Sequence, residues 1–161
     1  MWMPTALRPF KERDLDEVVA LALRAWEPVH QSMAEVLGAG INALVYPDWR
    51  VSQERDVRAA CMDPEQLVTV ATDAEGIVSG FVTVRIRGET GEIYMIAVDP
   101  SAHRRGIARA LTGHALEQMR GAGCRLALVS TGGDAGHAPA RQLYESAGFT
   151  GLPLVNYYRE L

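Results

Sequence analysis

Arg104, Arg105 and Gly106 form a short basic turn that could bind an anion. A β-type run ends at Val98, the dipeptide Asp-Pro follows, and a helical pattern begins directly after the glycine. Backbone N–H groups at a helix N-terminus are free and carry the positive end of the helix dipole, which favours a phosphate or pyrophosphate there. Gly106 has no side chain to stand between such a ligand and the backbone. The alternative is a solvated loop with no ligand, and this segment alone does not decide between the two.

A second segment, residues 138–149, reads Ala-Pro-Ala-Arg-Gln-Leu-Tyr-Glu-Ser-Ala-Gly-Phe. Its pattern predicts a short helix that ends at Gly148 and Phe149. Tyr144 lies in the last turns of this helix. Taken by itself, this tyrosine is an amphipathic side chain that packs on the sheet and keeps its hydroxyl in water.

Together the two segments resemble those of the GNAT acetyltransferase superfamily, which transfers acyl groups from acyl-coenzyme A to amines. The acyl-CoA turn of that family, usually written Gln/Arg-x-x-Gly-x-Gly/Ala, is matched by residues 103–108. The later segment, often Asn-x-x-Ala-x-x-Leu-Tyr-x-x-x-Gly-Phe, is matched from Ala140 to Phe149, and His137 stands where asparagine is common. The resemblance covers residues 67–149 well, whereas the earlier residues match only in their helix–helix layout.

The resemblance implies that acetyl-CoA is the co-substrate and assigns its binding residues. Backbone N–H groups of the turn would hold the pyrophosphate; the turn comprises His103, Arg104, Arg105, Gly106, Ile107 and Ala108. Ile96 and Val98 would pair their backbones with the pantetheine arm, as an added strand would. The N–H of Ile96 or Ala97 would hold the tetrahedral oxyanion.

The resemblance also implies two catalytic residues. Tyr144 occupies the position of a tyrosine that, in many relatives, protonates the leaving thiolate; its ordinary pKa of about 10 suits a thiol leaving group. Glu92 opens a strand in which some members place a catalytic glutamate, and it would take the proton that an amine must lose before it attacks. Strand alternation predicts that Glu92, Tyr94, Ile96 and Val98 share one face. The alternative for Glu92 is a solvated carboxylate at a strand end.

Acceptor pockets in this family are commonly built by the N-terminal helices and the last strands. An acidic and aromatic pocket would suit a cationic amine through its charge and cation–π contacts. The candidate residues are Trp26, Glu27, His30, Trp49 and Tyr157, with Tyr46, Asp48 and Tyr158 beside them. Each also has a structural explanation as a helix cap, a core residue or a strand residue.

The pattern along the chain predicts one acyl-CoA N-acyltransferase domain over residues 1–161 with an α/β (α+β) fold. Helices are expected from Asp14 to near Trp26, over 29–37, from Asp48 to before Pro64, over 106–120 and over 138–147. Strands are expected over 5–10, 67–71, 77–86, 92–98, 125–130 and 154–161. These make a mixed, mostly antiparallel sheet of about six to seven strands with helices on both faces.

Composition narrows the function classes. A net charge of −4 disfavours nucleic acid or an anionic membrane as the main partner. The four histidines show no metal-ligand spacing, and the two cysteines, Cys61 and Cys124, are expected to be buried thiols. The chain begins without a signal-peptide pattern and holds no apolar run of the ~20 residues that span a membrane, so a cytoplasmic protein is expected.

The leading hypothesis is an N-acetyltransferase that moves the acetyl group of acetyl-CoA directly to a primary amine of a small molecule or peptide. Cys61 and Cys124 lie outside both motifs, so no covalent intermediate is expected. The alternative is a catalytically silent acyl-CoA-binding sensor or regulatory module. A homodimer is possible, because many relatives are dimers. Nucleotide-triphosphate and dinucleotide folds are excluded by the lack of Gly-x-x-x-x-Gly-Lys-Ser/Thr and Gly-x-Gly-x-x-Gly.

Overall fold

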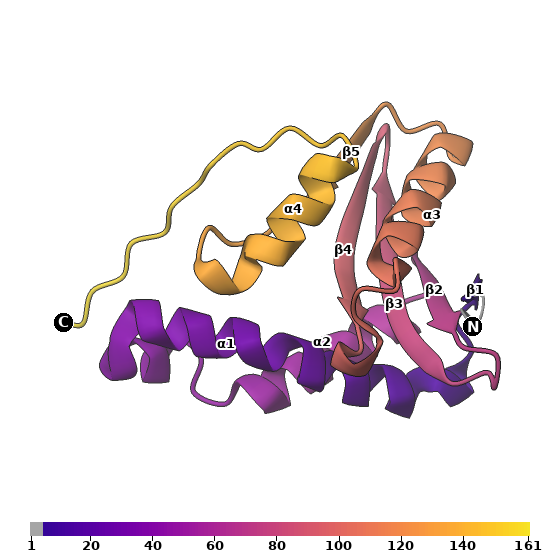
Figure 1. Ribbon diagram of the computed structural model, residues 1–161. Coiled ribbons are helices and arrows are strands. Elements are labelled where there is room, and N and C mark those ends of the chain that lie inside the picture. Colours follow the sequence, from indigo (N-terminus) through magenta and orange to yellow (C-terminus); the bar gives the residue numbers. More distant parts are fainter. Residues whose placement is uncertain (1–4) are drawn as a thin grey trace.

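A five-stranded sheet in the order β1-β2-β3-β4-β5 lies at the centre of the protein (Figure 1). The structure is a computed structural model that describes residues 5–161. The strands are β1 (Ala6–Pro9), β2 (Gln66–Thr72), β3 (Val78–Arg87), β4 (Thr90–Val98) and β5 (Leu126–Val129). Neighbouring strands from β1 to β4 are antiparallel, and β5 is parallel to β4. The predicted class of fold is confirmed, but the prediction of six to seven strands is too high for the residues described.

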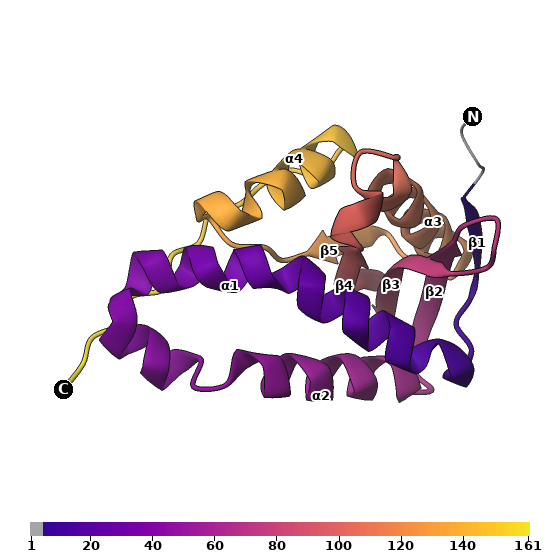
Figure 2. The same cartoon turned by 60° about the horizontal axis from the view of Figure 1, so that its bottom comes forward.

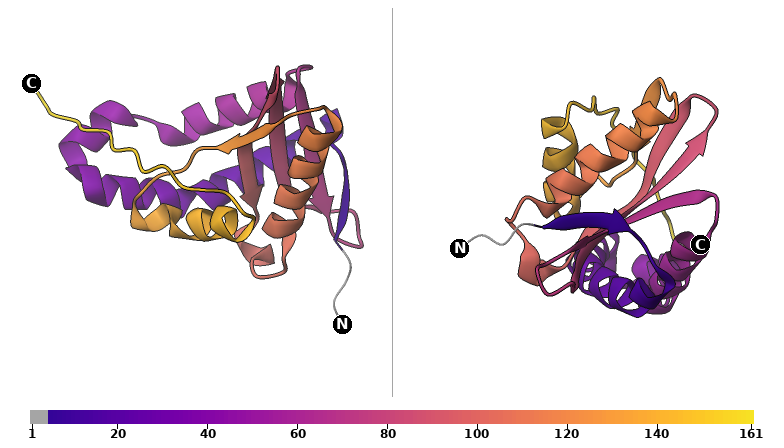
Figure 3. Two further views of the ribbon diagram at one scale, coloured as in Figure 1. Left: turned by 90° about the horizontal axis from the view of Figure 1, so that it is seen from above. Right: turned by 90° about the vertical axis from the view of Figure 1, so that its right-hand side faces the viewer.

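Helices cover both faces of the sheet, as predicted (Figure 3). The long helix α1 (Leu15–Val45) and α2 (Trp49–Met62) lie on one face, and α3 (Ile107–Gly121) lies on the other. The short helix α4 (Ala138–Ser146) follows β5 and lies across from α1 (Figure 2). Short 3-10 turns complete the chain: η1 (Glu12–Asp14), η2 (Pro100–Ala102) and η3 (Ala135–His137). None of the helices within residues 5–161 is long and apolar enough to cross a membrane.

Two apolar cores, one on each face, hold these layers together. The spacing of four residues along α3 places Ile107, Leu111, Ala115 and Met119 on one buried stripe against the sheet. Full burial of each large side chain in such a stripe stabilises the fold by about 1.5–3 kcal/mol. At Gly91 of β4 a Cβ atom would collide with the Met119 side chain, so glycine lets α3 approach the strand closely.

A β-bulge in β4 changes which side chains share a face. Thr83 of β3 pairs with Met95, but Val84 pairs with Ile93, so Tyr94 is the extra residue. The main-chain N–H of Met95 donates to Thr83 Oγ1 at 3.1 Å at this point.

Because of this bulge, the prediction that Glu92, Tyr94, Ile96 and Val98 share one face of the strand is wrong. Gly91 faces α3 and Ile93 belongs to the α3-side core, so Glu92 between them faces α1 and α2. Tyr94 also packs on the α1 side, whereas Ile96 and Val98 lie on the α3 side. The bulge therefore divides the four residues between the two faces.

Helix α1 differs from the prediction of two helices separated at Pro28. The helix continues through Pro28, and its non-helical residue is Gly38, with φ of 76°. The expected cap at Asp14 also differs. The Asp14 carboxylate accepts from the Lys11 N–H at 2.8 Å and from the Arg8 guanidinium, and makes no cap hydrogen bond to α1. The cap predicted at Asp48 is confirmed, because its side chain accepts from Val51 N–H at 3.4 Å.

The strand predicted over residues 154–161 is wrong for this structure. Residues 147–161 form no helix or strand and run as an extended tail past α4 (Figure 3). Leu152, Leu154 and Tyr157 are 81%, 84% and 92% exposed. The tail pairs with no strand edge among the residues described.

Strands β4 and β5 are paired only over a short length and then separate. The parallel ladder joins Thr90 to Leu126 and ends at the pair of Ile93 with Val129. From Tyr94 to Val98, the edge of β4 that faces away from β3 has no strand partner among the residues described. Beyond this pair β4 continues to η2 and β5 continues to η3. The opening between β4 and β5 is the space where these two strands are no longer paired.

Candidate active site

The turn between β4 and α3 presents a run of free backbone N–H groups. No hydrogen bond within residues 5–161 is made by the N–H groups from Arg104 to Arg109. Arg104 and Gly106 have φ of 62° and 73°, in the left-handed region, which turns this stretch of backbone sharply into the helix. A Cβ atom on Gly106 would meet nothing within 4 Å, so the space over this part of the turn is open. Free donors, a helix N-terminus and exposed arginines fit a pyrophosphate group.

The first residue of the motif, His103, uses its side chain within the fold. Its Nε2 lies 3.2 Å from the carbonyl oxygen of Val98, the last residue of β4. The imidazole therefore closes the turn back onto the strand that precedes it.

An ion pair connects the turn to α1. Arg24 Nε donates to Asp99 Oδ2 at 3.0 Å, and the other Asp99 oxygen accepts from the Ser101 N–H at 2.9 Å and its hydroxyl at 2.7 Å. Partial burial of Asp99 opposes its ionisation, but the hydrogen bonds from Arg24 and Ser101 outweigh this and hold the pKa of the carboxyl below its ordinary value.

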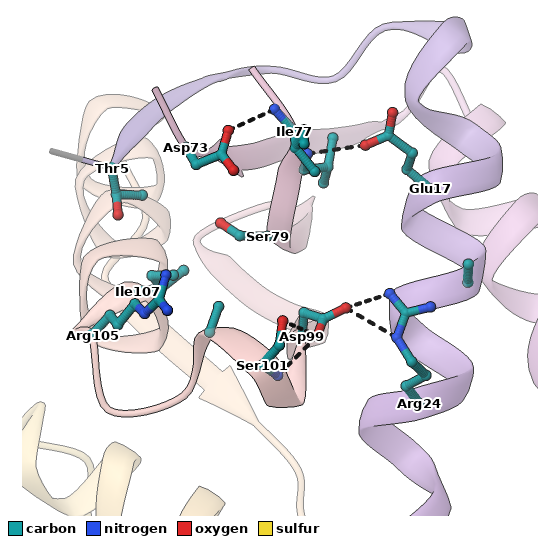
Figure 4. A pocket seen from close by; sticks show the side chains of 13 residues that line it. Thr5, Glu17, Arg24, Asp73, Ile77, Ser79, Asp99, Ser101, Arg105 and Ile107 are labelled. Atoms are coloured by element: carbon teal, nitrogen blue, oxygen red, sulfur yellow. Dashed lines mark hydrogen bonds and ion pairs between the residues drawn. The ribbon is translucent and has the colours of Figure 1, made fainter. Parts of the chain in front are cut away.

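A cavity of about 880 Å³ lies beside the turn, between α1 and the hairpin that joins β2 to β3 (Figure 4). The Arg24–Asp99 pair and Arg105 lie on its wall, with Glu17 on the side of α1. The Glu17 carboxylate is engaged, because it accepts from the Val78 N–H at 3.0 Å. The cavity therefore adjoins the free N–H groups, and its Arg24, Asp99 and Glu17 side chains already have hydrogen-bond partners in the protein.

The open edge of β4 places Ile96, Ala97 and Val98 where an extended ligand could pair with the strand. Ala97 and Val98 are buried and Ile96 is partly exposed, so the side chains of this stretch are fixed in the two cores. Backbone pairing needs no side chain, and the unpaired edge supplies the N–H and C=O groups for it.

Tyr144 is buried near the end of α4, and its ring packs against Phe149 at 5.9 Å between centroids. Burial raises the pKa of the Tyr144 hydroxyl to about 12. The hydroxyl is not among the fully buried polar atoms that lack a partner, so it reaches solvent. A tyrosine in this state is protonated at neutral pH and can donate its proton.

Glu92 lies two residues before the point at which β5 leaves β4. It pairs with Arg85 of β3 and Leu128 of β5, and its side chain is partly exposed on the α1 side. The neighbouring Arg85 guanidinium lies over the Tyr94 ring, 3.2 Å from its centroid. The carboxylate is therefore at the beginning of the opening, on the opposite face from Ile96.

Three of the predicted acceptor residues meet in one small cavity. Glu27, His30 and Trp49 line a space of about 300 Å³ between α1 and α2, together with Arg50. The His30 ring stacks on Trp49 with centroids 4.2 Å apart, and Tyr46 packs edge-on to His30 at 5.3 Å. Glu27 is ion-paired with Arg50, so its charge is partly neutralised.

The other two predicted acceptor residues lie elsewhere. Trp26 packs toward Phe81 at the α1-side core, with ring centroids 6.4 Å apart. Tyr157 lies on the exposed tail.

Burial lowers the pKa of His30, and a positive charge on His137 acts in the same direction. His30 Nδ1 is fully buried and has no hydrogen-bond partner within residues 5–161. Burial of this nitrogen on the aromatic stack favours the neutral form of the imidazole.

Sequence reasoning missed a polar cluster in the loop between β5 and α4. Asp134 accepts from the Ser32 hydroxyl of α1 at 2.6 Å and is paired with His137 Nδ1. The signal was present in the sequence Gly-Gly-Asp-Ala-Gly-His, where an acidic residue precedes a histidine by three positions among glycines.

Comparison with known proteins identifies the family of this fold. Residues 18–149 match the family model described as Acetyltransferase (GNAT) family. The chain belongs to the acetyltransferase (GNAT) family. Its membership agrees with the resemblance inferred from the two motifs, both of which lie within the matched residues.

Solved structures of GNAT acetyltransferases share this fold. The aminoglycoside acetyltransferase AAC(6')-Iy, in complex with a bisubstrate analogue of coenzyme A, superposes with a TM-score of 0.67 at 18% identity. That superposition covers 98% of this chain and 99% of the other. The ribosomal-protein-S18-alanine N-acetyltransferase of Escherichia coli gives a TM-score of 0.65 at 19% identity, over 93% and 80% of the two chains. At these identities the likeness concerns the fold alone.

Among curated proteins, the chain is similar to mycothiol acetyltransferases. It is 30% identical to that of Clavibacter michiganensis subsp. michiganensis over 96% of this chain and 45% of the relative. It is 39% identical to that of Beutenbergia cavernae over 60% of this chain and 32% of the relative. The chain thus spans about a third to a half of the length of these relatives.

Proposed function

We propose that this protein is an N-acetyltransferase that transfers the acetyl group of acetyl-CoA directly to a primary amine of a small molecule or peptide. One observation carries the proposal. The carboxyl end of the unpaired edge of β4 is followed, after the short η2 turn, by the run of free N–H groups from Arg104 to Arg109. A pantetheine arm bound along the edge would place a pyrophosphate at that run.

Three positions supply the chemistry. Backbone N–H groups of Ile96 or Ala97 hold the oxyanion that forms when the amine attacks the thioester. Tyr144, kept protonated by its burial, donates a proton to the leaving thiolate. Glu92 accepts a proton from the attacking nitrogen, because its side chain faces α1 at the beginning of the opening. Direct attack needs neither a metal nor a covalent enzyme intermediate.

The acceptor binds on the α1 side, against the stack of His30 on Trp49. A flat aromatic surface suits the C–H face of a ring or the apolar part of an amine. The side-chain amides of Gln31 and Asn42, which also line this cavity, suit hydroxyl groups. The pairing of Glu27 with Arg50 leaves little free negative charge there, and the Arg50 guanidinium already lies over the Trp49 ring, 4.5 Å from its centroid, so recognition there rests on shape and hydrogen bonding more than on charge. Relatives of this chain are named for aminoglycosides and for mycothiol, which makes these the first classes of acceptor to consider.

The test is release of free thiol from acetyl-CoA with a panel of amines. The panel contains aminoglycosides, polyamines, amino acids, arylamines and short peptides. We expect turnover with at least one amine and none with acceptors that carry hydroxyl groups alone. Tight binding of acetyl-CoA without turnover across the panel would overturn the proposal and favour a silent acyl-CoA-binding module.

A further inference from the structure

Asp134 and His137 form a dyad in the segment that joins β5 to α4, beside α1. His137 Nδ1 is hydrogen-bonded to Asp134 Oδ1, and the side chains are 18% and 13% exposed. A carboxylate that accepts from Nδ1 fixes the ring tautomer and leaves Nε2 unprotonated when the ring is neutral. Nε2 makes no hydrogen bond within residues 5–161, and it is not among the fully buried unpartnered atoms, so it reaches solvent.

The loop around the dyad is built to hold it. Asp134 also accepts from the Ser32 hydroxyl at 2.6 Å, and the Ser32 oxygen accepts from the Gly136 N–H at 2.9 Å. Arg141 Nη1 donates to the carbonyl oxygens of Gly132 and Asp134 at 2.7 and 2.8 Å. A Cβ atom on Gly132 would collide with the His137 ring, so the backbone packs directly against the imidazole.

The hydrogen bonds also exclude a serine nucleophile here. Ser32 donates to the carboxylate and not to the histidine, so no base activates its hydroxyl. Partial burial of Asp134 opposes its ionisation, but hydrogen bonds from Ser32 and His137 outweigh this and hold the pKa of the carboxyl below its ordinary value. A carboxylate that stays ionised stabilises an imidazolium beside it.

The dyad is close to both the acceptor cavity and the helix that carries Tyr144. Ser32 and His30 face different sides of α1, but His30, which lines the acceptor cavity, still feels the charge of His137. On the other side, His137 caps α4, and Tyr144 follows it on the same helix seven residues later, about 10 Å along the axis. The charged and titratable groups near the dyad include Arg141 of its own segment, His30 of α1, and Tyr46, which feels the charge of Asp134.

We propose that His137, held by Asp134, removes the first proton from the acceptor ammonium group before the amine attacks. This inference rests on the proposed function. An ammonium nitrogen must lose two protons to become an amide. His137 Nε2 takes the first, directly or through one water, and passes it to solvent. Glu92 takes the second as the N–C bond forms and the C–S bond breaks, and Tyr144 gives one proton to the thiolate. The net change is one proton released for each ammonium acetylated.

The two proton acceptors differ in how their variants respond to pH. A free amine needs no first deprotonation, so a defect in His137 should disappear where the acceptor is already neutral. An acceptor with an α-amino group, whose pKa is about 7.7–8.0, is protonated at pH 6.5 and mostly neutral at pH 9. A defect in Glu92 should persist at both pH values, because the second proton must still leave.

The experiment measures kcat/KM of wild type, His137→Asn, Asp134→Asn, Glu92→Gln and Ser32→Ala from pH 6.5 to 9. His137→Asn should lose ~10²-fold at pH 6.5 and come within about threefold of wild type at pH 9. Glu92→Gln should lose a similar factor of kcat/KM at pH 6.5 and at pH 9. Ser32→Ala keeps the dyad and loosens its anchor to α1, so its smaller loss should not depend on pH. Circular dichroism and acetyl-CoA affinity establish that each variant is folded.

If wild type is active, two results would overturn this inference and leave the proposed function standing. One is an unchanged kcat/KM in His137→Asn, and the other is a loss of kcat/KM in His137→Asn that is equal at every pH. Absence of turnover by wild type with every amine would instead overturn the proposed function, and this inference with it. Nitrogen NMR of the His137 ring gives a readout that does not need turnover. In wild type the proton should lie on Nδ1, and Asp134→Asn should abolish that preference; a proton on Nε2 in wild type would overturn the inference.

Discussion

Arg24 of α1 and Asp99 of the β4–α3 turn are joined by an ion pair, with Arg24 Nε 3.0 Å from Asp99 Oδ2. The pair links the helix that carries the acceptor cavity to the segment that presents the free N–H groups. Asp99 is mostly buried, at 13% exposed, whereas Arg24 is 56% exposed. The carboxylate therefore organises the turn from within, and the arginine adds a contact that solvent weakens.

Arg24→Met should weaken acetyl-CoA binding slightly and leave kcat unchanged. A half-exposed ion pair contributes about 0.2–1 kcal/mol, which corresponds to at most about a fivefold rise in the dissociation constant. Asp99→Asn should have a larger effect, because that carboxylate also accepts two hydrogen bonds from Ser101. Titration calorimetry with acetyl-CoA measures both. Equal effects of the two substitutions would show that the Arg24 contact, and not the Ser101 turn, sets the geometry.

Gly106→Glu should abolish acetyl-CoA binding while the fold stays intact. A side chain there meets open space, so nothing in the protein collides with it. Its carboxylate would lie over the N–H groups that should hold the pyrophosphate, and would repel it. Gly106→Ala is the matched control, because it adds only the strain of a left-handed residue, about 1–2 kcal/mol. Unchanged affinity of Gly106→Glu for acetyl-CoA, measured by calorimetry, would refute the proposed binding site.

The sequence predicted those parts of the fold that depend on local pattern. The i+4 spacing of Ile107, Leu111, Ala115 and Met119 marks a buried helix face, and the structure confirms it. The hairpin at residues 73–76 follows from turn residues between two β-type runs, and Asp73 indeed accepts from the Ile77 N–H at 2.9 Å. Both features are decided within a few residues, so a single sequence contains the whole signal.

Features decided by distant partners could not be predicted. The bulge at Tyr94 depends on how β4 pairs with β3, and it reverses the faces that alternation assigns. The tail beyond Gly148 has a strand-like pattern, but a strand also needs an edge to pair with. The dyad of Asp134 and His137 is anchored by Ser32, which is about a hundred residues earlier in the chain. The spacing of histidines along the chain bears on metal binding, but it carries no signal for a carboxylate–histidine pair.

Tyr144→Phe should lower kcat by about 10²-fold or more, with little change in acetyl-CoA affinity. The substitution removes the proton donor and keeps the ring packing against Phe149. Since burial raises the pKa of the hydroxyl to about 12, the wild-type rate should not fall through loss of this proton below that pH. Steady-state kinetics measure the role of Tyr144 as a proton donor, and a thermal melt measures its role in packing. Wild-type turnover in Tyr144→Phe would leave the tyrosine a packing residue.

Cys61 should make the fold sensitive to alkaline pH. The thiol is 5% exposed, and burial raises its pKa to about 12. In the unfolded chain a cysteine ionises near pH ~8.5. Between these two values the unfolded state binds fewer protons than the folded state, so the free energy of unfolding falls as pH rises. The slope approaches about 1.4 kcal/mol per pH unit for one group.

Urea denaturation from pH 8 to pH 9 measures this slope before Tyr144 adds to it, since a tyrosine in the unfolded chain ionises near pH ~10. Cys61→Ala should be less stable at pH 8 by about 1 kcal/mol, because a small buried group is lost, and its stability should change less with pH. Cys124→Ala is the matched control, since it retains the buried thiol and should keep the wild-type slope. If Cys61→Ala and wild type lose stability in parallel, the buried thiol is not the group that makes the fold alkali-sensitive.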